Sequence, residues 1–253
     1  MTNAAFTATA LDGIPTVQTG ADLAAIILTA LDATKIALQQ GDVLIVAQKI
    51  VSKAEGRRVL LQDVEPSAEA LELAERSEKD PRLVELILRE SVSVLRCRPG
   101  LVVVKHRCGY VLANAGIDAS NVEGDDMVLL LPVDSDKSAA RLQAALAERC
   151  GVTPGIVIND SFGRAWRVGT VGTAIGVAGL PAVIDLRGQP DRNGRPLRVS
   201  ELGVADEIAA AGSLLMGQGD EGRPVVHVRG LPFPVGNGRA ANLVRRQDLD
   251  LFR

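Results

Sequence analysis

Aromatic residues are scarce in this chain, which has one Trp, one Tyr and four Phe among 253 residues. So few rings exclude an extended stacking platform for nucleic-acid bases. The formal net charge of −3 likewise gives no basic field that would attract a nucleic acid. Because 47% of the residues are hydrophobic, we predict a globular protein with an aliphatic, alanine-rich core and no nucleic-acid partner.

Cysteines are also few, and long apolar runs are missing. Cys97, Cys108 and Cys150 are widely spaced and form no CxxC pair, which argues against a disulfide framework or a structural zinc site. We predict that they are small buried residues in a reducing compartment. No apolar run approaches the ~18 residues of a membrane helix, and the N-terminus lacks the features of a signal peptide. The expected location is cytoplasmic, with no membrane partner.

Two common ligand motifs are absent as well. Glycines alternate with small apolar residues over 169–180, but no Gly-Lys-Ser/Thr follows, so this segment is not a Walker motif. It suits close backbone packing or a phosphate loop. His106 and His227 lack a His, Cys or carboxylate at ligand spacing. This favours structural or surface histidines over metal ligands.

The most informative stretch that is present covers residues 159–167. It follows the apolar residues 155–158, which predict a buried strand. A strand that ends there would place Asp160 and Ser161 at the carboxyl edge of a sheet, where open α/β sheets bind ligands. Both offer oxygen ligands, and Arg164 or a second arginine three residues later could bind phosphate. The alternative is a capped turn with two solvated arginines.

Other polar clusters occupy 48–56, 114–123 and 216–222. In the first, Lys49 and Lys53 share a face if the segment is helical. They predict either a solvated basic turn or a phosphate contact. The last cluster predicts a mobile acidic turn.

The middle cluster is a glycine turn that carries Asp118, Ser120, Asn121 and Glu123. Alone, it could be a loop shaped by Asx turns. Together with Asp160, it predicts a carboxylate pair for magnesium or manganese, ions that usually share their ligands with nucleotide phosphates.

Regular elements alternate along the chain. Helices are predicted over 21–32, 65–95, 136–149 and 200–216. Strands are predicted over 43–47, 101–104, 109–112, 127–133, 155–158, 181–186 and 224–228. Asp80 and Asp136 are the expected caps of two of the helices; residues 235–253 are expected to be a peripheral tail. The pattern predicts an α/β fold with mixed sheets and flanking helices.

Over about residues 10–230, the chain resembles the coenzyme F420-0:L-glutamate ligases, also called F420 gamma-glutamyl ligases. Seven unrelated short segments carry this resemblance in the family's order, which makes it specific. They are Gly41-Asp42-Val43-Leu44, Ser52-Lys53-Ala54-Glu55-Gly56, residues 114–122, Asp160-Ser161-Phe162-Gly163-Arg164, residues 174–176, residues 204–209 and Leu215-Met216-Gly217.

The resemblance implies an unusual α/β fold and an intertwined homodimer. It implies a GTP-dependent ligase that needs manganese or magnesium and is helped by a monovalent cation such as potassium. The implied reaction adds L-glutamate to the lactyl carboxylate of F420-0 and can extend a gamma-linked tail in coenzyme F420 biosynthesis. Some family members carry a fused C-terminal flavin-binding domain. We expect instead a single ligase domain over 1–253, either undivided or made of two subdomains.

The resemblance also assigns site residues. The implied metal ligands are Asp118, Asp160, Ser161 and Gln218, the last at a position that is usually acidic in the family. The implied GTP contacts are Gly13, Ile14, Pro15, Thr16, Gln48, Lys53, Asn121, Met216, Gly217, Gln218, Gly219, Asp220, Glu221, Gly222 and Arg223. The predicted catalytic residues are Asp118, Asp160, Lys53 and Arg164.

Elementary chemistry supports this reading. Amide formation needs an activated carbonyl, and phosphoryl transfer from GTP would supply an acyl phosphate that the amine of glutamate attacks. Such transfer depends on positioning and charge neutralisation, which metals held by Asp118 and Asp160 would provide. The alternatives are an amide ligase for another phosphorylated acid, a nucleotide-sensing protein without turnover and a metal-dependent phosphohydrolase.

Overall fold

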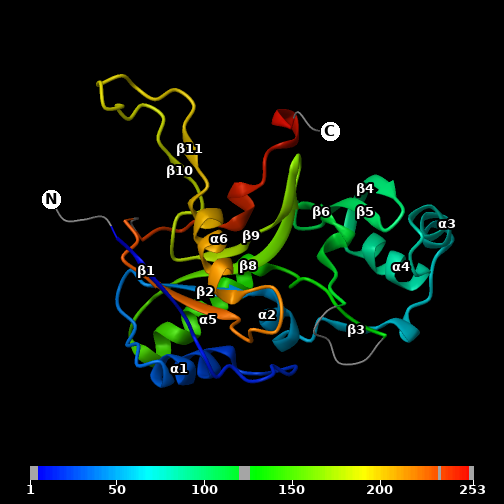
Figure 1. Cartoon of the computed structure of the whole chain (residues 1–253), viewed down its shortest axis with the longest axis horizontal. Coiled ribbons are helices and arrows are strands. Elements are labelled where there is room, and N and C mark those ends of the chain that lie inside the picture. Colours follow the sequence, from blue (N-terminus) through cyan, green and yellow to red (C-terminus); the bar gives the residue numbers. More distant parts are fainter. Residues whose placement is uncertain (1–4, 120–125, 233–234, 251–253) are drawn as a thin grey trace.

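A five-stranded sheet forms the body of the computed structural model, which describes residues 5–119, 126–232 and 235–250. The strand order is β1-β12-β2-β8-β9, as Figure 1 shows. The bounds are β1 Thr7–Ala10, β12 Val225–Arg229, β2 Val43–Ala47, β8 Gly155–Arg164 and β9 Arg167–Ala178. β2 and β8 are parallel, whereas the other neighbours are antiparallel. The predicted mixed α/β architecture is therefore confirmed.

Helices cover both faces of this sheet because its strands are apolar on both sides. α1 (Leu23–Ala33), α2 (Gln48–Ala54) and α5 (Ser135–Cys150) pack on one face, and α6 (Val204–Met216) packs on the other (Figure 1). Along β2, Leu44 lies in the first core and Ile45 in the second, since successive strand residues point to opposite faces. The core is aliphatic and rich in alanine, as predicted.

A smaller part of the chain lies beside the body (Figure 1). Its elements are β3 Arg58–Leu60, α3 Ala68–Ser77, α4 Pro81–Arg89, β4 Ser91–Arg98, β5 Leu101–His106, β6 Val111–Ala113 and β7 Met127–Leu129, with short 3-10 turns at Leu61–Asp63 and Asn114–Gly116. β4-β5-β6 form one sheet and β3-β7 another. Arg57 ties this part to the segment before α5, since its Nε donates to the Leu131 carbonyl at 2.8 Å and its Nη2 lies 2.8 Å from Glu90.

A long arm also projects from the body (Figure 1). β10 (Ile184–Asp185) pairs with β11 (Glu201–Leu202), and the residues between them are mostly exposed. The last 3-10 turns lie at Ala240–Leu243 and Gln247–Leu249.

Several local predictions are confirmed. The helix predicted over 21–32 is α1, which Asp22 caps by accepting a hydrogen bond from the Ala25 N–H. The predicted cap Asp80 does cap α4, where Pro81 occupies the first turn. The strands predicted over 101–104 and 109–112 correspond to β5 and β6, which pair in antiparallel fashion. Glycines of 169–180 serve close packing: a Cβ at Gly172 would lie 2.5 Å from a carbonyl oxygen of α6.

The prediction that the strand ends in Asn-Asp-Ser, residues 159–161, and opens into a glycine turn is wrong. β8 continues to Arg164, reverses over residues 165–166 and returns as β9. Ser161 and Gly163 pair with Gly172 and Thr170 of β9, so the ladder satisfies the backbone of this polar stretch.

Other boundaries also differ from the predictions. Residues 91–95 belong to strand β4 instead of a helix; the strands predicted over 127–133 and 181–186 are each shorter; and α6 begins at Val204. The cap of α5 is Asp134, not Asp136. Asp136 instead accepts the backbone N–H groups of Val177 and Ala240. Since Ala240 is fully buried, the expectation of a peripheral tail is wrong there.

The cysteines are free thiols, but the expectation that they are buried is wrong. Cys150 is exposed, and Cys97 and Cys108 are half-buried. His106 and His227 are both buried, which agrees with a structural role. Within the described parts of the chain, no helix combines the length and apolar character needed to cross a membrane.

Candidate active site

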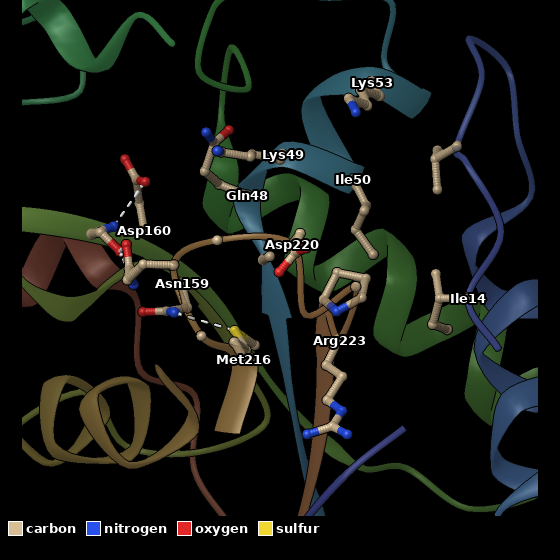
Figure 2. A pocket seen from close by; sticks show the side chains of 18 of the residues that line it. Ile14, Gln48, Lys49, Ile50, Lys53, Asn159, Asp160, Met216, Asp220 and Arg223 are labelled. Carbon is tan, nitrogen blue, oxygen red and sulfur yellow. Dashed lines mark hydrogen bonds between the residues drawn. The ribbon is translucent and has the colours of Figure 1, made fainter. Parts of the chain in front are cut away.

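Four segments that are far apart in sequence line one cavity of about 520 Å³. They are the turn 14–17, the start of α2, the middle of β8 and the loop after α6 (Figure 2). The volume lies within the range of small-molecule sites, and the lining mixes apolar and charged side chains, as such sites do.

The sheet explains why these segments meet. β2 and β8 are parallel neighbours, and Ala47 at the end of β2 lies opposite Asn159. Parallel strands present their carboxyl ends at the same edge of the sheet. Gln48 and Lys49 therefore emerge beside Asp160. A register shift against β9 lies between Ile158 and Asn159; such an irregularity re-aims side chains.

The charged centre of the site contains Asp118, Asp160 and Lys49. Lys49 Nζ lies 2.7 Å from Asp118 Oδ2, and Asp118 is fixed by a backbone bridge to Leu129. Burial raises the pKa of Asp160 to about 6; the Ser161 N–H opposes this shift, the Asp118 charge adds to it and the Lys49 charge opposes it. A carboxylate in surroundings that disfavour its charge attracts a proton or a metal ion.

The donor set suits magnesium or manganese, since those ions take oxygen ligands. Asp118 and Asp160 supply two carboxylates, while Ser161 Oγ and Gln218 Oε1 lie 3.0 Å apart. Among the described residues, no three His, Cys, Asp or Glu side chains are grouped so as to hold a metal. An ion here would take its other ligands from neutral oxygens and from substrate phosphates, as magnesium commonly does.

Asn159 adds an unsatisfied polar atom. It is 4% exposed; its Nδ2 donates to Ser213 Oγ at 3.0 Å. Its Oδ1 is buried without a hydrogen-bond partner among the described residues. Because a buried acceptor without a partner costs about 1–3 kcal/mol, the position suits a donor group or cation of a ligand in the cavity.

The loop after α6 owes its shape to its own backbone and to Glu221. Gly217 has a φ of 73°, a value that favours glycine. The Glu221 carboxylate accepts the Gly219 N–H at 2.8 Å, and N–H groups of the loop, led by its own and that of Gly219, hold the pKa of Glu221 below its usual range. Arg223 pairs with Asp12 at 3.3 Å, so the loop also contacts the segment before the first lining turn.

The structure brings most of the predicted site residues together. Those that line the cavity are Ile14, Pro15, Thr16, Gln48, Lys53, Asp160, Ser161, Met216, Gly217, Gln218, Gly219, Asp220, Gly222 and Arg223.

A few predicted residues do not line it. Gly13 and Glu221 adjoin lining residues in the chain but are not part of the wall, and Asp118 meets the cavity through Lys49. Arg164 is exposed at the far end of β8. The predicted contact Asn121 lies outside the described residues, as do Ser120 and Glu123.

Two lining residues that carry charge or unsatisfied polarity, Arg58 and Asn159, were not predicted from the sequence, whereas Lys49 was predicted with Lys53 as either part of a solvated basic turn or a phosphate contact. Asn159 precedes the Asp-Ser pair, and this position was a signal that could have found it. Arg58 gave no such signal, because its approach depends on how β3 packs beside the turn 14–17, where its Nη2 donates to the Val17 carbonyl at 2.9 Å.

Comparison with known proteins adds to this geometry. A family model described as F420-0:Gamma-glutamyl ligase matches residues 13–230. The chain belongs to this family. The "Coenzyme F420:L-glutamate ligase" of Methanothermobacter thermautotrophicus is 45% identical over 245 residues, which cover 96% of this chain and 97% of that protein. Proteins of the same name from Methanopyrus kandleri (94% of this chain, 93% of that protein) and Archaeoglobus fulgidus (96% and 94%) are 44% and 42% identical.

Proposed function

We propose that this protein is a ligase that joins the carboxylate of coenzyme F420-0 to the amine of L-glutamate, with GTP as the energy source. Gamma-linked extension of the glutamate tail belongs to the same proposal. Its main support is the shared cavity, in which the turn 14–17, α2, β8 and the loop 216–224 meet. Membership of the F420-0:gamma-glutamyl ligase family supports the same substrates.

The cavity has the cations that a triphosphate requires. Lys49, Lys53, Arg58 and Arg223 all line it, and such groups bind phosphate oxygens through charge-assisted hydrogen bonds. Arg58 lies beside the turn 14–17, and Arg223 lies on the loop after α6. In this proposal the phosphates lie along α2, and the turn and the loop enclose the rest of the nucleotide.

The proposed reaction has two steps. An oxygen of the F420-0 carboxylate attacks the γ-phosphorus of GTP, and GDP leaves with the electron pair of the broken bond. The amine nitrogen of glutamate then attacks the acyl carbon, phosphate leaves and the amine loses its proton. Neither step requires a covalent bond to the protein, so catalysis rests on positioning and on neutralising charge.

Divalent metal is part of the proposal. Asp118 and Asp160 would hold manganese or magnesium, with Ser161 and Gln218 as neutral oxygen ligands. When bound, the ion would neutralise charge that develops on the phosphate oxygens. Potassium as an additional activating ion remains part of the proposal on the family resemblance.

Arg164 keeps a proposed role despite its distance from the wall of the cavity. It follows Asp160 on the same strand and is exposed. F420-0 must approach the site from solvent and carries anionic groups. We assign Arg164 to those groups instead of the nucleotide phosphates.

An intertwined homodimer is proposed as well. The arm between β10 and β11 extends from the body with Val199 85% exposed, and the β8-β9 hairpin exposes Trp166 and Val168 at its tip. Exposed apolar side chains on projecting segments suit an exchange of arms between two copies of the chain.

The test is a turnover assay with purified protein, GTP, manganese, F420-0 and L-glutamate, in which GDP and the product mass are both measured. We expect one or more glutamyl additions that depend on every component. Asp160→Asn should lower turnover by at least about 100-fold, because it removes a charged metal ligand. Asp248→Asn is the matched control, since Asp248 pairs with Arg246 away from the cavity.

Other outcomes point to the alternatives. GDP release without a glutamylated product would favour a phosphohydrolase or a different acceptor acid. Nucleotide binding without GDP release would favour a sensing protein.

A further inference from the structure

Lys49 forms an ion pair with Asp118, the carboxylate that the proposed reaction needs for a metal ion. Its Nζ lies 2.7 Å from Asp118 Oδ2, and the two side chains are 32% and 23% exposed. Lys49 lines the cavity and points toward the side that carries Asp160 (Figure 2). An ammonium group and a divalent ion repel each other strongly at the short distances that one shared oxygen imposes. Metal binding at Asp118 Oδ2 therefore requires the ammonium group to move away.

The local charges show where that ammonium group can go. Asp118, Asp160 and Lys49 together carry two negative charges and one positive charge. The charges of Asp118 and Lys49 both act on Asp160. Addition of a divalent ion leaves the group with a net positive charge. A nucleotide triphosphate in the same cavity supplies the missing negative charge and offers phosphate oxygens to the Lys49 ammonium group.

Lys49 can make this move without a change of fold. It is the second residue of α2, whose start is fixed by the end of β2. Its flexible four-carbon stem lets the ammonium group travel while the helix stays in place. Gln48, by contrast, is 2% exposed and accepts a hydrogen bond from Ser52 at 2.8 Å, so the neighbouring position is rigid.

We propose that Lys49 is a phosphate-binding residue that is held on Asp118 until the metal ion arrives. Lys49 neutralises Asp118 before metal binds; when metal takes that carboxylate, the Lys49 ammonium group transfers to an oxygen of the nucleotide phosphates. This inference rests on the proposed function, because it assumes metal and nucleotide in this cavity. The exchange makes metal and nucleotide strengthen each other's binding by the same factor.

The test measures manganese binding to the full-length protein by the electron paramagnetic resonance signal of free Mn²⁺, with and without a non-hydrolysable GTP analogue. In Lys49→Met, Mn²⁺ alone should bind about threefold to tenfold more tightly than in the wild type, because its competitor is gone. The enhancement of Mn²⁺ binding by the analogue should fall by about fivefold or more.

Lys53→Met is the matched control, since it removes the same charge from the same cavity and lies toward the other end of α2 (Figure 2). It should weaken binding of the analogue and leave the affinity for Mn²⁺ alone within about twofold of the wild type. If Lys49→Met does not fold, the same two measurements are made on Lys49→Gln, which retains polarity, and the same results are expected. Circular dichroism reports the fold of each variant.

Unchanged or weaker binding of Mn²⁺ alone to the folded Lys49 variants would overturn the inference. Absence of Mn²⁺ binding to every protein would overturn both the inference and the proposed metal site. If the variants bind Mn²⁺ as expected but the turnover assay gives no glutamylated product, the proposed function alone is overturned.

Discussion

Asp42 shows how a single buried charge is stabilised in this protein. It is 1% exposed and lies before β2; both nitrogens of the Arg229 fork donate to it, at 2.8 and 2.6 Å. His227 Nε2 lies 2.9 Å from the same carboxylate. Burial alone would raise the pKa of Asp42, but the hydrogen bonds from Arg229 and the Gln39 N–H, together with the nearby His227 side chain, outweigh it and hold the pKa below its usual range. The cluster joins β2 to β12.

Asp42→Asn should reduce the free energy of unfolding by about 3 kcal/mol at pH 7, because it leaves buried donors without their charged partner. The pKa of Asp42 is lower in the folded state, so its contribution is complete above the unfolded pKa, about 3.9. It is lost as pH falls through the folded value. Urea unfolding at a series of pH values should therefore show the two proteins converging below about pH 4. A constant difference across that range would contradict this account.

Gln218 is the neutral member of the proposed metal ligands. It is hydrogen-bonded to Ser161, with Nε2 2.9 Å from the hydroxyl oxygen. Gln218→Glu should tighten Mn²⁺ binding roughly tenfold, because added carboxylate charge raises the affinity of oxygen-ligand sites. Calorimetric titration measures the change, and Gln218→Ala, which adds no charge, should not tighten binding. Equal affinity in the glutamate variant and the wild type would remove Gln218 from the ligand set.

At the residue level, the sequence pointed to the cavity where the pattern is local, and it missed contacts that depend on packing. Asp160 and Ser161 line the cavity, and they could be singled out because adjacent oxygen-bearing side chains after an apolar run are a local pattern; their role as metal ligands stays a prediction. The Lys49–Asp118 pair joins α2 to the segment after β6, so no spacing along the chain predicts it. Asp136 illustrates the opposite error, since it resembles a cap but binds backbone N–H groups from β9 and the C-terminal segment.

The β8-β9 hairpin is the element that carries the site, and its packing against α6 depends on glycine. At Gly172 a Cβ would lie 2.2 Å from Ser213 Oγ and 2.5 Å from the Ala209 carbonyl oxygen. Since Ser213 also accepts a hydrogen bond from Asn159, displacement of α6 would disturb the wall of the cavity.

Gly172→Ala should destabilise the protein by about 2–3 kcal/mol, because the added methyl group meets backbone that cannot rotate away. It should also weaken nucleotide binding through the loop that follows α6. Gly163→Ala on the same hairpin is the control: among the described residues, apart from its chain neighbours, no atom lies within 4 Å of the place that the new methyl group would take. This change should stay within about 0.5 kcal/mol. Denaturant unfolding compares the two variants, and similar losses in both would refute the packing argument.

The sequence predicted helices well where the hydrophobic period and the polar residues at the helix start agree on where the helix begins, as in α1 and α4. It missed the second half of β8 because polar and glycine residues there resemble a turn. That segment is a strand because β9 offers it a continuous ladder of partners, and such non-local pairing overrides local preference. Residues 91–95, the first part of β4, have a helical pattern in sequence, although the register of β4 against β5 fixes them as a strand.

At the scale of the whole molecule, the projecting arm between β10 and β11 is mostly exposed and packs little against the body. Replacement of residues 187–198 by an Asn-Gly turn would keep the β10-β11 pairing while removing the exposed loop. If the arm holds two copies together, light scattering should give about twice the chain mass of 26.6 kDa for the wild type and a single chain mass for the shortened protein. Unchanged thermal unfolding at low concentration would show that the shortened chain still folds. A dimeric mass for both proteins would exclude the arm as the interface.

The sheet order has a consequence for synthesis on the ribosome. β1 is made first among the strands, yet it pairs with β12, which is made last and lies between β1 and β2. At ordinary translation speeds β1 therefore waits on the order of ten seconds or more for its only neighbour in this sheet. The turn 14–17 follows β1, and the loop 216–224 precedes β12. A nascent chain that stops short of β12 contains these lining segments but not the strand that pairs with both β1 and β2. The segments are then not held together, so truncated products of translation should neither bind nucleotide nor consume it.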